Sequence, residues 1–271
     1  MKTAFDHIAA EYDTYRPSYP QEVLEHLQSL LDAAGGEQHK ATGLDRRHIA
    51  ATVVDVGAGT GIFSRQLAAC GWRVIAVEPS VTMLREGIVS RTDATYDRRR
   101  LHAVAAGAEQ IPIASGSTDL ITAAQAFHWF NPPIALAEFA RVLRPGGAIA
   151  LMWNNRDPSR HPIVDQFENL IRHYNPAHER DYREQDWPAK IAHTGLFDTM
   201  IEHRMEWEWN ITPDQFVGFS RTISYIRNVI ARDRLPRFED ELRTLAITAF
   251  PDGVVRLPMW TGLWTARRLA R

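Results

Sequence analysis

Between about residues 50 and 155, short apolar runs rich in β-branched residues alternate with stretches of helical, amphipathic spacing. Alternation of strand and helix on this scale is typical of a parallel sheet joined by right-handed crossovers and covered by helices on both faces. The pattern predicts strands at 51–56, 73–77, 101–105, 118–123 and 148–153, and helices at 62–69, 80–89 and 132–143.

The pattern changes on either side of this core. Two amphipathic stretches, at 4–15 and 20–31, come before it and are followed by a Gly- and His-containing linker at 35–43. After it, residues 160–195 and 213–250 have helical spacing, whereas 200–211 and 254–268 alternate as strands do. We therefore predict one integrated α/β domain with a doubly wound, mostly parallel sheet of seven strands. Its parts are N-terminal helices and linker at 1–45, the core at 46–155, and a largely helical region with the last strands at 156–271.

The chain has 271 residues, a formal net charge of −2 and a single cysteine. The near-neutral charge gives no electrostatic reason to expect binding to nucleic acid or to an anionic membrane. One cysteine excludes an internal disulfide and a cysteine-based metal cluster. The N-terminal segment lacks the apolar core of a signal peptide, and no apolar run reaches the about 18 residues of a membrane span. These observations favour a cytoplasmic protein without nucleic-acid or membrane partners.

The strongest local motif is the segment 53–61, where a strand leads into a turn of spacing G-x-G-x-G and then into a helix. Such a turn lets the backbone approach a ligand closely at the carboxyl edge of a sheet. Ile62 stands where dinucleotide-binding proteins place a third small residue, and no Lys-Ser/Thr pair completes a phosphate-binding loop.

Two acidic residues flank this turn in the predicted sheet. Asp55, just before the turn, suits a cationic ligand, and Glu78, at the end of the next strand, can accept both hydroxyls of a ribose. The structural alternatives are a turn-stabilising cap for Asp55 and a helix N-terminal charge for Glu78. Both acids end adjacent strands on the same edge of the sheet, which favours a shared ligand site.

Motifs along the first part of the chain resemble one enzyme family. They lie at 5–13, 16–20, 55–61, 78–79, 107–112, 124–130 and 141–147, and they follow the family's order over most of residues 1–155. On these motifs the chain resembles a class I S-adenosylmethionine-dependent methyltransferase of the type 11 small-molecule group, similar to the ubiquinone-biosynthesis and trans-aconitate methyltransferases. The resemblance implies a Rossmann-like core, a small-molecule methyl acceptor and S-adenosyl-L-homocysteine as product; displacement at a sulfonium needs no metal. Residues 160–271 match only in outline, as a region that shapes the acceptor pocket would.

The resemblance also assigns roles to single residues. The glycine turn and Asp55 would hold the methionine part of the cofactor, Glu78 would bind the ribose, and Arg16, in an N-terminal lid segment, would pair with the cofactor's carboxylate. The segment 105–107 departs from the family because it lacks the acidic residue that many relatives carry there. The implied cofactor contacts are Tyr12, Arg16, Asp55, Gly57, Ala58, Gly59, Thr60, Gly61, Glu78, Pro79, Met83, Ala108, Glu109, Gln125 and Ala126.

Methyl transfer from a sulfonium is an in-line displacement, so the protein mainly aligns the acceptor, excludes water and, for some acceptors, removes a proton. His128, at the carboxyl end of the fourth predicted strand, is the candidate general base because histidine titrates near neutral pH. The alternatives are that His128 forms the pocket wall or has a structural role. Tyr19, Trp129, Asn154 and Arg156 are the predicted acceptor contacts. No spacing of His and carboxylate residues indicates a metal site.

Two other functional classes stay open. An NAD(P)-dependent oxidoreductase is opposed by Ile62 and by the segment 124–129, and an inactive binding protein of the same fold is opposed by the intact acids and glycines. The segment 131–134 resembles the Asn-Pro-Pro-Tyr motif of DNA amino-methyltransferases, but Ile134 replaces the aromatic residue that stacks on a flipped base. We therefore predict that Asn131 begins a helix there. The acceptor and the oligomeric state are not determined by the sequence.

Overall fold

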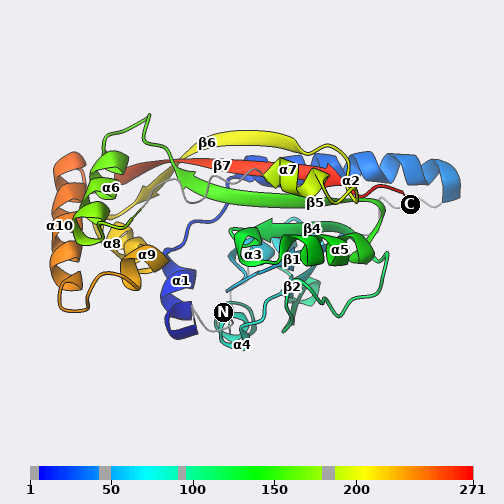
Figure 1. Ribbon diagram of the computed structural model, residues 1–271, viewed down its shortest axis with the longest axis horizontal. Coiled ribbons are helices and arrows are strands. Elements are labelled where there is room, and N and C mark those ends of the chain that lie inside the picture. The colour runs from blue at the N-terminus through cyan, green and yellow to red at the C-terminus, as the bar shows by residue number, and fades with distance from the viewer. Residues whose placement is uncertain (1–5, 43–49, 91–95, 179–186, 271) are drawn as a thin grey trace.

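Seven strands form one sheet in the order β3-β2-β1-β4-β5-β7-β6 in the computed structural model, which describes residues 6–42, 50–90, 96–178 and 187–270. The first five strands are parallel, and β7 pairs antiparallel with both β5 and β6 (Figure 1). The predicted seven-stranded, mostly parallel sheet is therefore confirmed. The strands are β1 (Thr52–Val56), β2 (Arg73–Val77), β3 (Leu101–Val104), β4 (Thr118–Ala124), β5 (Leu143–Arg156), β6 (Ile201–Ile211) and β7 (Val255–Arg267).

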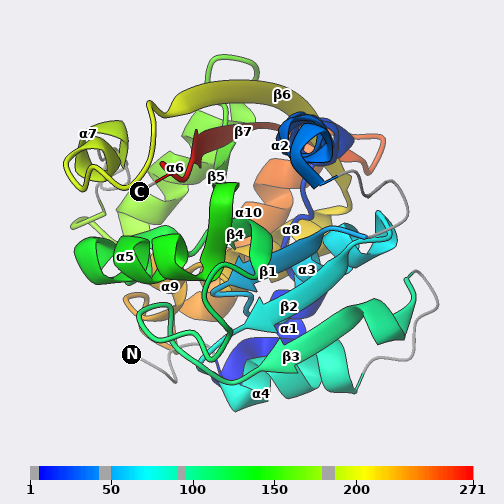
Figure 2. The ribbon, with the colours of Figure 1, turned by 90° about the vertical axis from the view of Figure 1, so that its right-hand side faces the viewer.

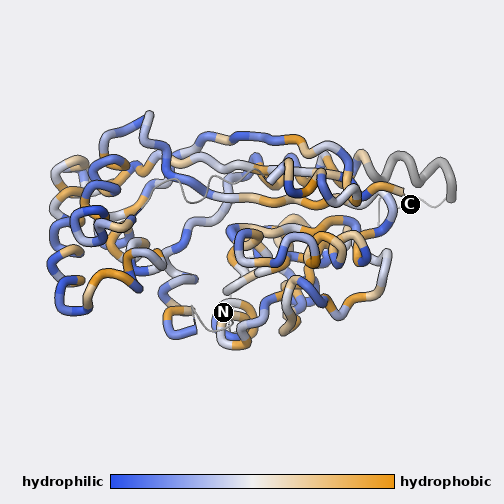
Figure 3. Tube along the Cα trace, in the orientation of Figure 1, coloured by the Kyte–Doolittle hydropathy of each residue, from blue (hydrophilic) through white to orange (hydrophobic). Residues whose placement is uncertain are grey.

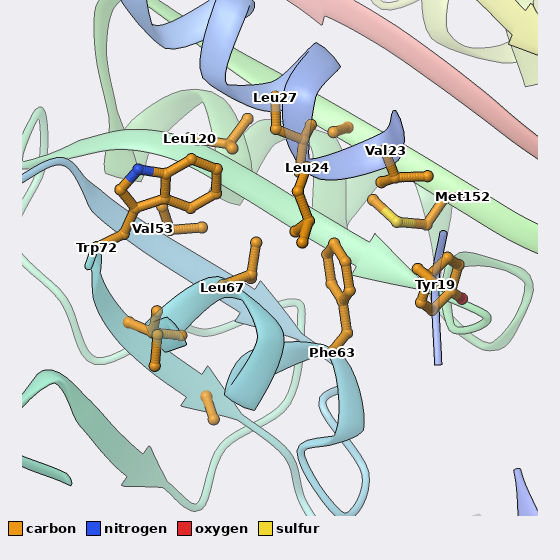
Figure 4. Packing of buried hydrophobic residues seen from close by; sticks show 14 of the residues in the cluster. Tyr19, Val23, Leu24, Leu27, Val53, Phe63, Leu67, Trp72, Leu120 and Met152 are labelled. Atoms are coloured by element: carbon orange, nitrogen blue, oxygen red, sulfur yellow. The ribbon is translucent and has the colours of Figure 1, made fainter. Parts of the chain in front are cut away.

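Helices cover both faces of this sheet (Figure 2). On one face, α2 (Gln21–Thr42) and α3 (Ile62–Ala69) pack through Leu27 and Leu67 into a core that includes Val53 of β1 (Figure 4). On the other face lie α5 (Pro132–Val142) and α7 (Trp187–Ala192), whose core includes Val54 from the same strand. Successive β1 residues thus enter opposite cores, as the alternation of side chains along a strand requires.

The carboxyl end of the sheet is extended by a group of helices, which we call the cap. It consists of α6 (Ile163–Tyr174), α8 (Pro213–Arg221), α9 (Ser224–Arg227) and α10 (Leu235–Ala249), which share a third apolar core with the adjoining end of β7. Figure 1 shows the cap beyond the ends of the long strands, and Figure 3 shows that apolar and hydrophilic positions are interspersed along its helices. Much of the predicted C-terminal region is therefore placed beside the edge where ligands bind in such sheets.

A short N-terminal helix joins the cap to the core. After a 3-10 turn at Asp6–Ile8, α1 (Ala9–Tyr15) contacts both α8 and the helical turn Arg85–Val89 that follows α4 (Val81–Leu84). The contact with α8 is close, because a Cβ atom on Gly218 would lie 2.5 Å from the Tyr15 ring.

Two local expectations differ from the structure. The helix predicted at 20–31 continues to Thr42, so the linker predicted at 35–43 is wrong for residues 35–42. Extending a formed helix is far easier than nucleating one. The two glycines in this stretch each lower the stability of the helix by only about 1 kcal/mol. The strand predicted at 148–153 is longer, from Leu143 to Arg156, because it pairs with β4 at Leu143 and with β7 as far as Arg156. The predicted Ser80 cap is confirmed, since its Oγ accepts the Met83 N–H at 3.1 Å.

Candidate cofactor and active site

A cavity of about 290 Å³ lies where β1, β2 and β4 end, and α1 forms part of its wall. Residues far apart in sequence meet there, which is the position expected for a ligand in an open α/β sheet. Of the predicted cofactor contacts, those that line the cavity are Tyr12, Arg16, Asp55, Gly57, Ala58, Gly59, Thr60, Glu78, Pro79, Met83, Ala108, Glu109, Gln125 and Ala126. Gly61 does not line it; with a φ of +77° it forms the N-cap of α3.

The glycine turn is shaped by its neighbours as well as by its own backbone. Gly57 has a φ of +69°, and a Cβ atom there would lie 2.5 Å from the Cβ of Ala126. Its N–H donates to the Val77 carbonyl at 2.8 Å, which ties the turn to the end of β2. A side chain at Gly57 would therefore displace the chain beyond β4 and distort the cavity floor.

Asp55 is buried at the base of the cavity, with 1% of its surface exposed. Its two oxygens accept hydrogen bonds from the Ser64 hydroxyl at 2.5 Å and the Thr122 hydroxyl at 2.8 Å. Burial raises the pKa of Asp55 to about 6, against the lowering effect of these two hydrogen bonds, and the nearby charge of Glu78 raises it further. Within the described ranges no cationic side chain pairs with Asp55, so a ligand cation would relieve the cost of its charge.

Glu78 borders both the glycine turn and α4. Its Oε2 accepts the Gly59 N–H at 3.0 Å and its Oε1 accepts the Ser80 N–H at 2.9 Å. Burial raises the pKa of Glu78, and the two backbone hydrogen bonds act in the opposite direction. Each carboxylate oxygen keeps a second lone pair, so the fixed carboxylate can still accept two hydroxyl groups.

The charge of the lining is mainly negative. Asp6, Asp55, Glu78 and Glu109 contribute carboxylates, and Arg16 is the basic side chain among the described lining residues. Such a cavity favours a cationic ligand with one anionic group.

Arg16 reaches the cavity from the segment after α1. Its guanidinium donates to the Thr222 carbonyl at 2.7 Å, between α8 and α9, and lies over the rings of Tyr12 and Phe219. Asp13 in the same helix forms an ion pair with Arg65 of α3 at 2.8 Å. The N-terminal segment is thus anchored both to the core and to the cap.

His128 lies outside the cavity lining, in the turn Phe127–Trp129 that follows β4. Its Nδ1 accepts the indole N–H of Trp153 at 3.2 Å, and its ring lies against Trp129 at 4.7 Å between centroids. A neutral imidazole with an acceptor at Nδ1 carries its proton on Nε2. In this arrangement, the lone pair that a general base would use is directed at Trp153.

The four predicted acceptor contacts are placed differently from one another. Tyr19, Trp129 and Asn154 line the cavity, and Trp129 is also 44% exposed. The Asn154 side chain donates to the Ser18 carbonyl at 3.1 Å and accepts from Thr261 at 2.5 Å, so it fixes the segment after α1.

Arg156 is not brought to the cavity lining. It is engaged in the cap, where its guanidinium pairs with Glu168 and donates to the Tyr225 hydroxyl at 2.8 Å. His178 contacts the same carboxylate at 2.8 Å and stacks on Tyr225. Arg156 therefore joins β5 to the cap helices.

Several lining residues were not predicted from the sequence. They are Asp6, Pro17, Ile62, Phe63, Ser80, Gly107, Ala124 and Phe130. Ile62 and Phe63 lie in the first turn of α3, Ser80 caps α4, and the others lie within the sequence motifs already named. The helix N-terminal position was the signal that could have found Phe63.

Among the described residues, a metal ion would need a cluster of ligand side chains, and a membrane span would need a long apolar helix. No group of three or more His, Cys, Asp or Glu residues in that part of the chain could hold a metal ion. No helix there is both long and apolar enough to cross a membrane.

The chain is similar in sequence and in fold to known methyltransferases. Residues 54–151 match the family model of a methyltransferase domain, type 11. An uncharacterized methyltransferase of Mycobacterium tuberculosis is 31% identical over 248 residues, which cover 92% of this chain and 87% of the relative. An uncharacterized methyltransferase of Schizosaccharomyces pombe is 34% identical over 163 residues, or 60% of this chain and 56% of that protein. A solved structure of a candidate type II methyltransferase from Anaeromyxobacter dehalogenans has the same fold, with a TM-score of 0.61, 22% identity and coverage of 95% of this chain and 100% of its own.

The fold and the matched relatives define the class of this protein. The chain belongs to the class I S-adenosylmethionine-dependent methyltransferases. The lining fits that cofactor on independent structural grounds: a backbone turn that excludes a side chain at Gly57, a buried carboxylate at Asp55 and a buried Tyr19 hydroxyl that has no partner in the described parts of the chain.

Proposed function

We propose that this enzyme transfers the methyl group of S-adenosylmethionine to a small-molecule acceptor and releases S-adenosylhomocysteine. The observation that carries the proposal is the meeting of Asp55, the glycine turn and Glu78 around one acidic cavity. When bound, the cofactor supplies a methyl group already activated by a positively charged sulfur. The remaining work of the protein is to hold the two reactants in line and to exclude water.

The lining residues divide between the two ends of the cofactor. The turn at 57–61 and Asp55 would hold its amino-acid end, and Glu78 would accept the ribose hydroxyls. Pro79, Met83, Ala108 and Glu109 would surround the adenine, and Glu109 is held in place because it accepts the Asn131 N–H at 2.9 Å. Gln125 and Ala126 would face the methionine, with Gln125 fixed by its hydrogen bond to the Asn154 carbonyl at 2.7 Å.

The acceptor would enter past the aromatic side chains of Tyr12, Trp129 and Phe130, which line the cavity. Aromatic faces next to a sulfonium stabilise its charge, and they also favour a flat or apolar acceptor. His128 as the general base stays a prediction. The contact of its Nδ1 with Trp153 favours a role in orienting the methyl acceptor, to which the Nε2–H group would donate a hydrogen bond.

Titration calorimetry with S-adenosylmethionine, S-adenosylhomocysteine and NAD tests the proposal. We expect micromolar binding of both sulfur ligands and no detectable binding of NAD. Binding of NAD with no response to either sulfur ligand would overturn the proposal. Binding of both sulfur ligands, with no methylated product from any member of a set of carboxylate, amine, phenol and enol acceptors, would favour the inactive binding protein.

A further inference from the structure

Two buried hydroxyl groups belong to residues that line the cavity. The Tyr19 residue is 7% exposed and the Thr60 residue 1% exposed. Neither the Tyr19 phenol oxygen nor the Thr60 Oγ1 has a hydrogen-bond partner among the residues that the structure describes. A buried polar group without a partner is unfavourable, so a ligand that supplies the missing partner binds more tightly.

Hydrogen bonds to its backbone and packing of its ring hold Tyr19 in place. Gln66 of α3 clamps its backbone, with the amide oxygen accepting the Tyr19 N–H at 2.9 Å and the amide nitrogen donating to the Tyr19 carbonyl at 2.8 Å. The Tyr19 ring packs edge-on against Phe63 at 4.8 Å between centroids, at the margin of the apolar cluster in Figure 4. The Ser18 carbonyl just before it accepts from Asn154. The position of the hydroxyl is therefore fixed before any ligand binds.

The surroundings of this hydroxyl determine which ligand atom it suits. Burial raises the pKa of Tyr19 well above its ordinary value, and Tyr12 and Asp55 raise it further, so the phenol keeps its proton and acts as a donor. Arg16 acts on the pKa of Tyr19 in the opposite direction, and its side chain lines the same cavity as Tyr19. A neutral donor in a cavity that also holds a guanidinium suits an anionic oxygen, and the buried Asp55 of the same cavity suits an ammonium group.

We propose that the Tyr19 hydroxyl donates a hydrogen bond to the α-carboxylate of the cofactor's amino-acid end, the group with which the family resemblance already pairs Arg16. This proposal rests on the proposed function. It moves Tyr19 from the acceptor side, where the sequence placed it, to the cofactor side. An acceptor carboxylate would have the same chemistry, and the experiment below distinguishes the two sources.

Binding of two nucleosides to Tyr19→Phe tests the proposal. S-adenosylhomocysteine carries the amino-acid end, whereas 5′-methylthioadenosine has the same nucleoside and sulfur without it. We expect Tyr19→Phe to weaken S-adenosylhomocysteine by about 10- to 100-fold, as loss of one hydrogen bond to a charged group would. We expect 5′-methylthioadenosine to bind the variant as tightly as it binds the wild-type enzyme. The matched control is Tyr174→Phe, since Tyr174 is a buried tyrosine of α6 that does not line the cavity, and it should leave both affinities unchanged.

Three other outcomes would contradict either the proposal or the function on which it rests. Unchanged affinity of Tyr19→Phe for S-adenosylhomocysteine overturns the proposal and leaves the hydroxyl to the acceptor side. An equal loss for both nucleosides also overturns it, because the change would then act through the shape of the cavity. Failure of the wild-type enzyme to bind S-adenosylhomocysteine contradicts the proposed function itself, and so differs from either result with the variant.

Discussion

The indole N–H of Trp153 donates a hydrogen bond to Nδ1 of His128 at 3.2 Å. This contact joins β5 to the turn after β4 and sets the tautomer of the histidine, because the protonated nitrogen of a neutral imidazole must then be Nε2. Trp153 is itself fixed by parallel stacking on Trp187 of α7, with the ring centroids 5.4 Å apart. The chemistry available at His128 is therefore decided by a residue from a different strand.

We predict that neutral His128 is in the Nε2–H form. Long-range ¹H–¹⁵N NMR spectra recorded at alkaline pH, where histidine is neutral, should show an unprotonated Nδ1 for this residue. Trp153→Phe keeps an aromatic ring but removes the donor, so it should produce a mixture of tautomers. A protonated Nδ1 in the wild-type enzyme would contradict the arrangement.

His128→Ala should lower turnover while leaving the dissociation constant of S-adenosylhomocysteine within about twofold, since His128 does not line the cavity. The pH dependence of turnover distinguishes the two roles. If His128 is the general base, the rate falls as the histidine is protonated, and Trp153→Phe changes this pH dependence. A retained wild-type rate in His128→Ala would exclude both roles.

Asp55→Asn should stabilise the free enzyme and weaken its cofactor binding. Because burial raises the pKa of Asp55 from 3.8 to about 6, the folded state binds its proton more tightly than the unfolded chain does. The stability contributed by this group is therefore greatest below about pH 4 and falls as pH rises through about pH 6, by roughly 3 kcal/mol in total. The amide removes that cost at neutral pH, and the hydroxyls of Ser64 and Thr122 can turn to suit it.

Denaturation and titration calorimetry at about pH 8 would measure both effects of Asp55→Asn. We expect a gain of about 1–3 kcal/mol in unfolding free energy and a loss of about 1–3 kcal/mol in S-adenosylhomocysteine affinity. The wild-type affinity should also fall between about pH 8 and pH 5, and this fall should be smaller in the variant. A variant that is less stable and binds as tightly as the wild type would refute the assignment of Asp55.

Glu78→Gln should weaken S-adenosylhomocysteine and 5′-methylthioadenosine equally, by about 1–3 kcal/mol each. Both nucleosides carry the ribose whose hydroxyls Glu78 would accept, and the amide offers one acceptor oxygen in place of two. Calorimetry with the two ligands measures the effect, and the contrast with Tyr19→Phe separates the two ends of the cavity. A loss confined to S-adenosylhomocysteine would place Glu78 at the amino-acid end.

Gln66→Leu should reproduce part of the effect of Tyr19→Phe without removing the phenol. The leucine cannot make the two hydrogen bonds to the Tyr19 backbone, at 2.9 and 2.8 Å, so the hydroxyl would lose its fixed position. We expect a selective loss of affinity for S-adenosylhomocysteine over 5′-methylthioadenosine. Gln66→Glu keeps one acceptor for the Tyr19 N–H and should recover part of the loss.

Gly218→Ala should loosen the N-terminal helix. Alanine favours a helix by about 1 kcal/mol over glycine, yet the added Cβ would lie 2.5 Å from two atoms of the Tyr15 ring. We therefore expect a lower melting temperature and faster proteolysis within α1. The double variant Tyr15→Ala/Gly218→Ala removes the collision, so it should be more stable than the sum of the single effects predicts.

Patterns that depend on neighbouring residues were predictable from the sequence. The period of apolar residues predicted the strands of the core, because side-chain alternation is a local property of the backbone. The Ser80 cap and the glycine turn were equally local, and Asp55 and Glu78 were expected at one sheet edge because each ends a strand. The family motifs at 55–61, 78–79 and 124–130 lie within or just after these strands.

Contacts between distant segments were decided by the tertiary structure alone. Nothing near Tyr19 in the sequence indicates that Gln66 holds its backbone, and nothing near His128 indicates that Trp153 occupies its Nδ1. Arg156 is close in sequence to Asn154, yet it pairs with Glu168 in the cap, whereas Asn154 lines the cavity. The sequence alone determined which chemical groups this enzyme places at the edge of its sheet. Packing decided which way they face, because a side chain's partners depend on segments that meet only when the chain is folded.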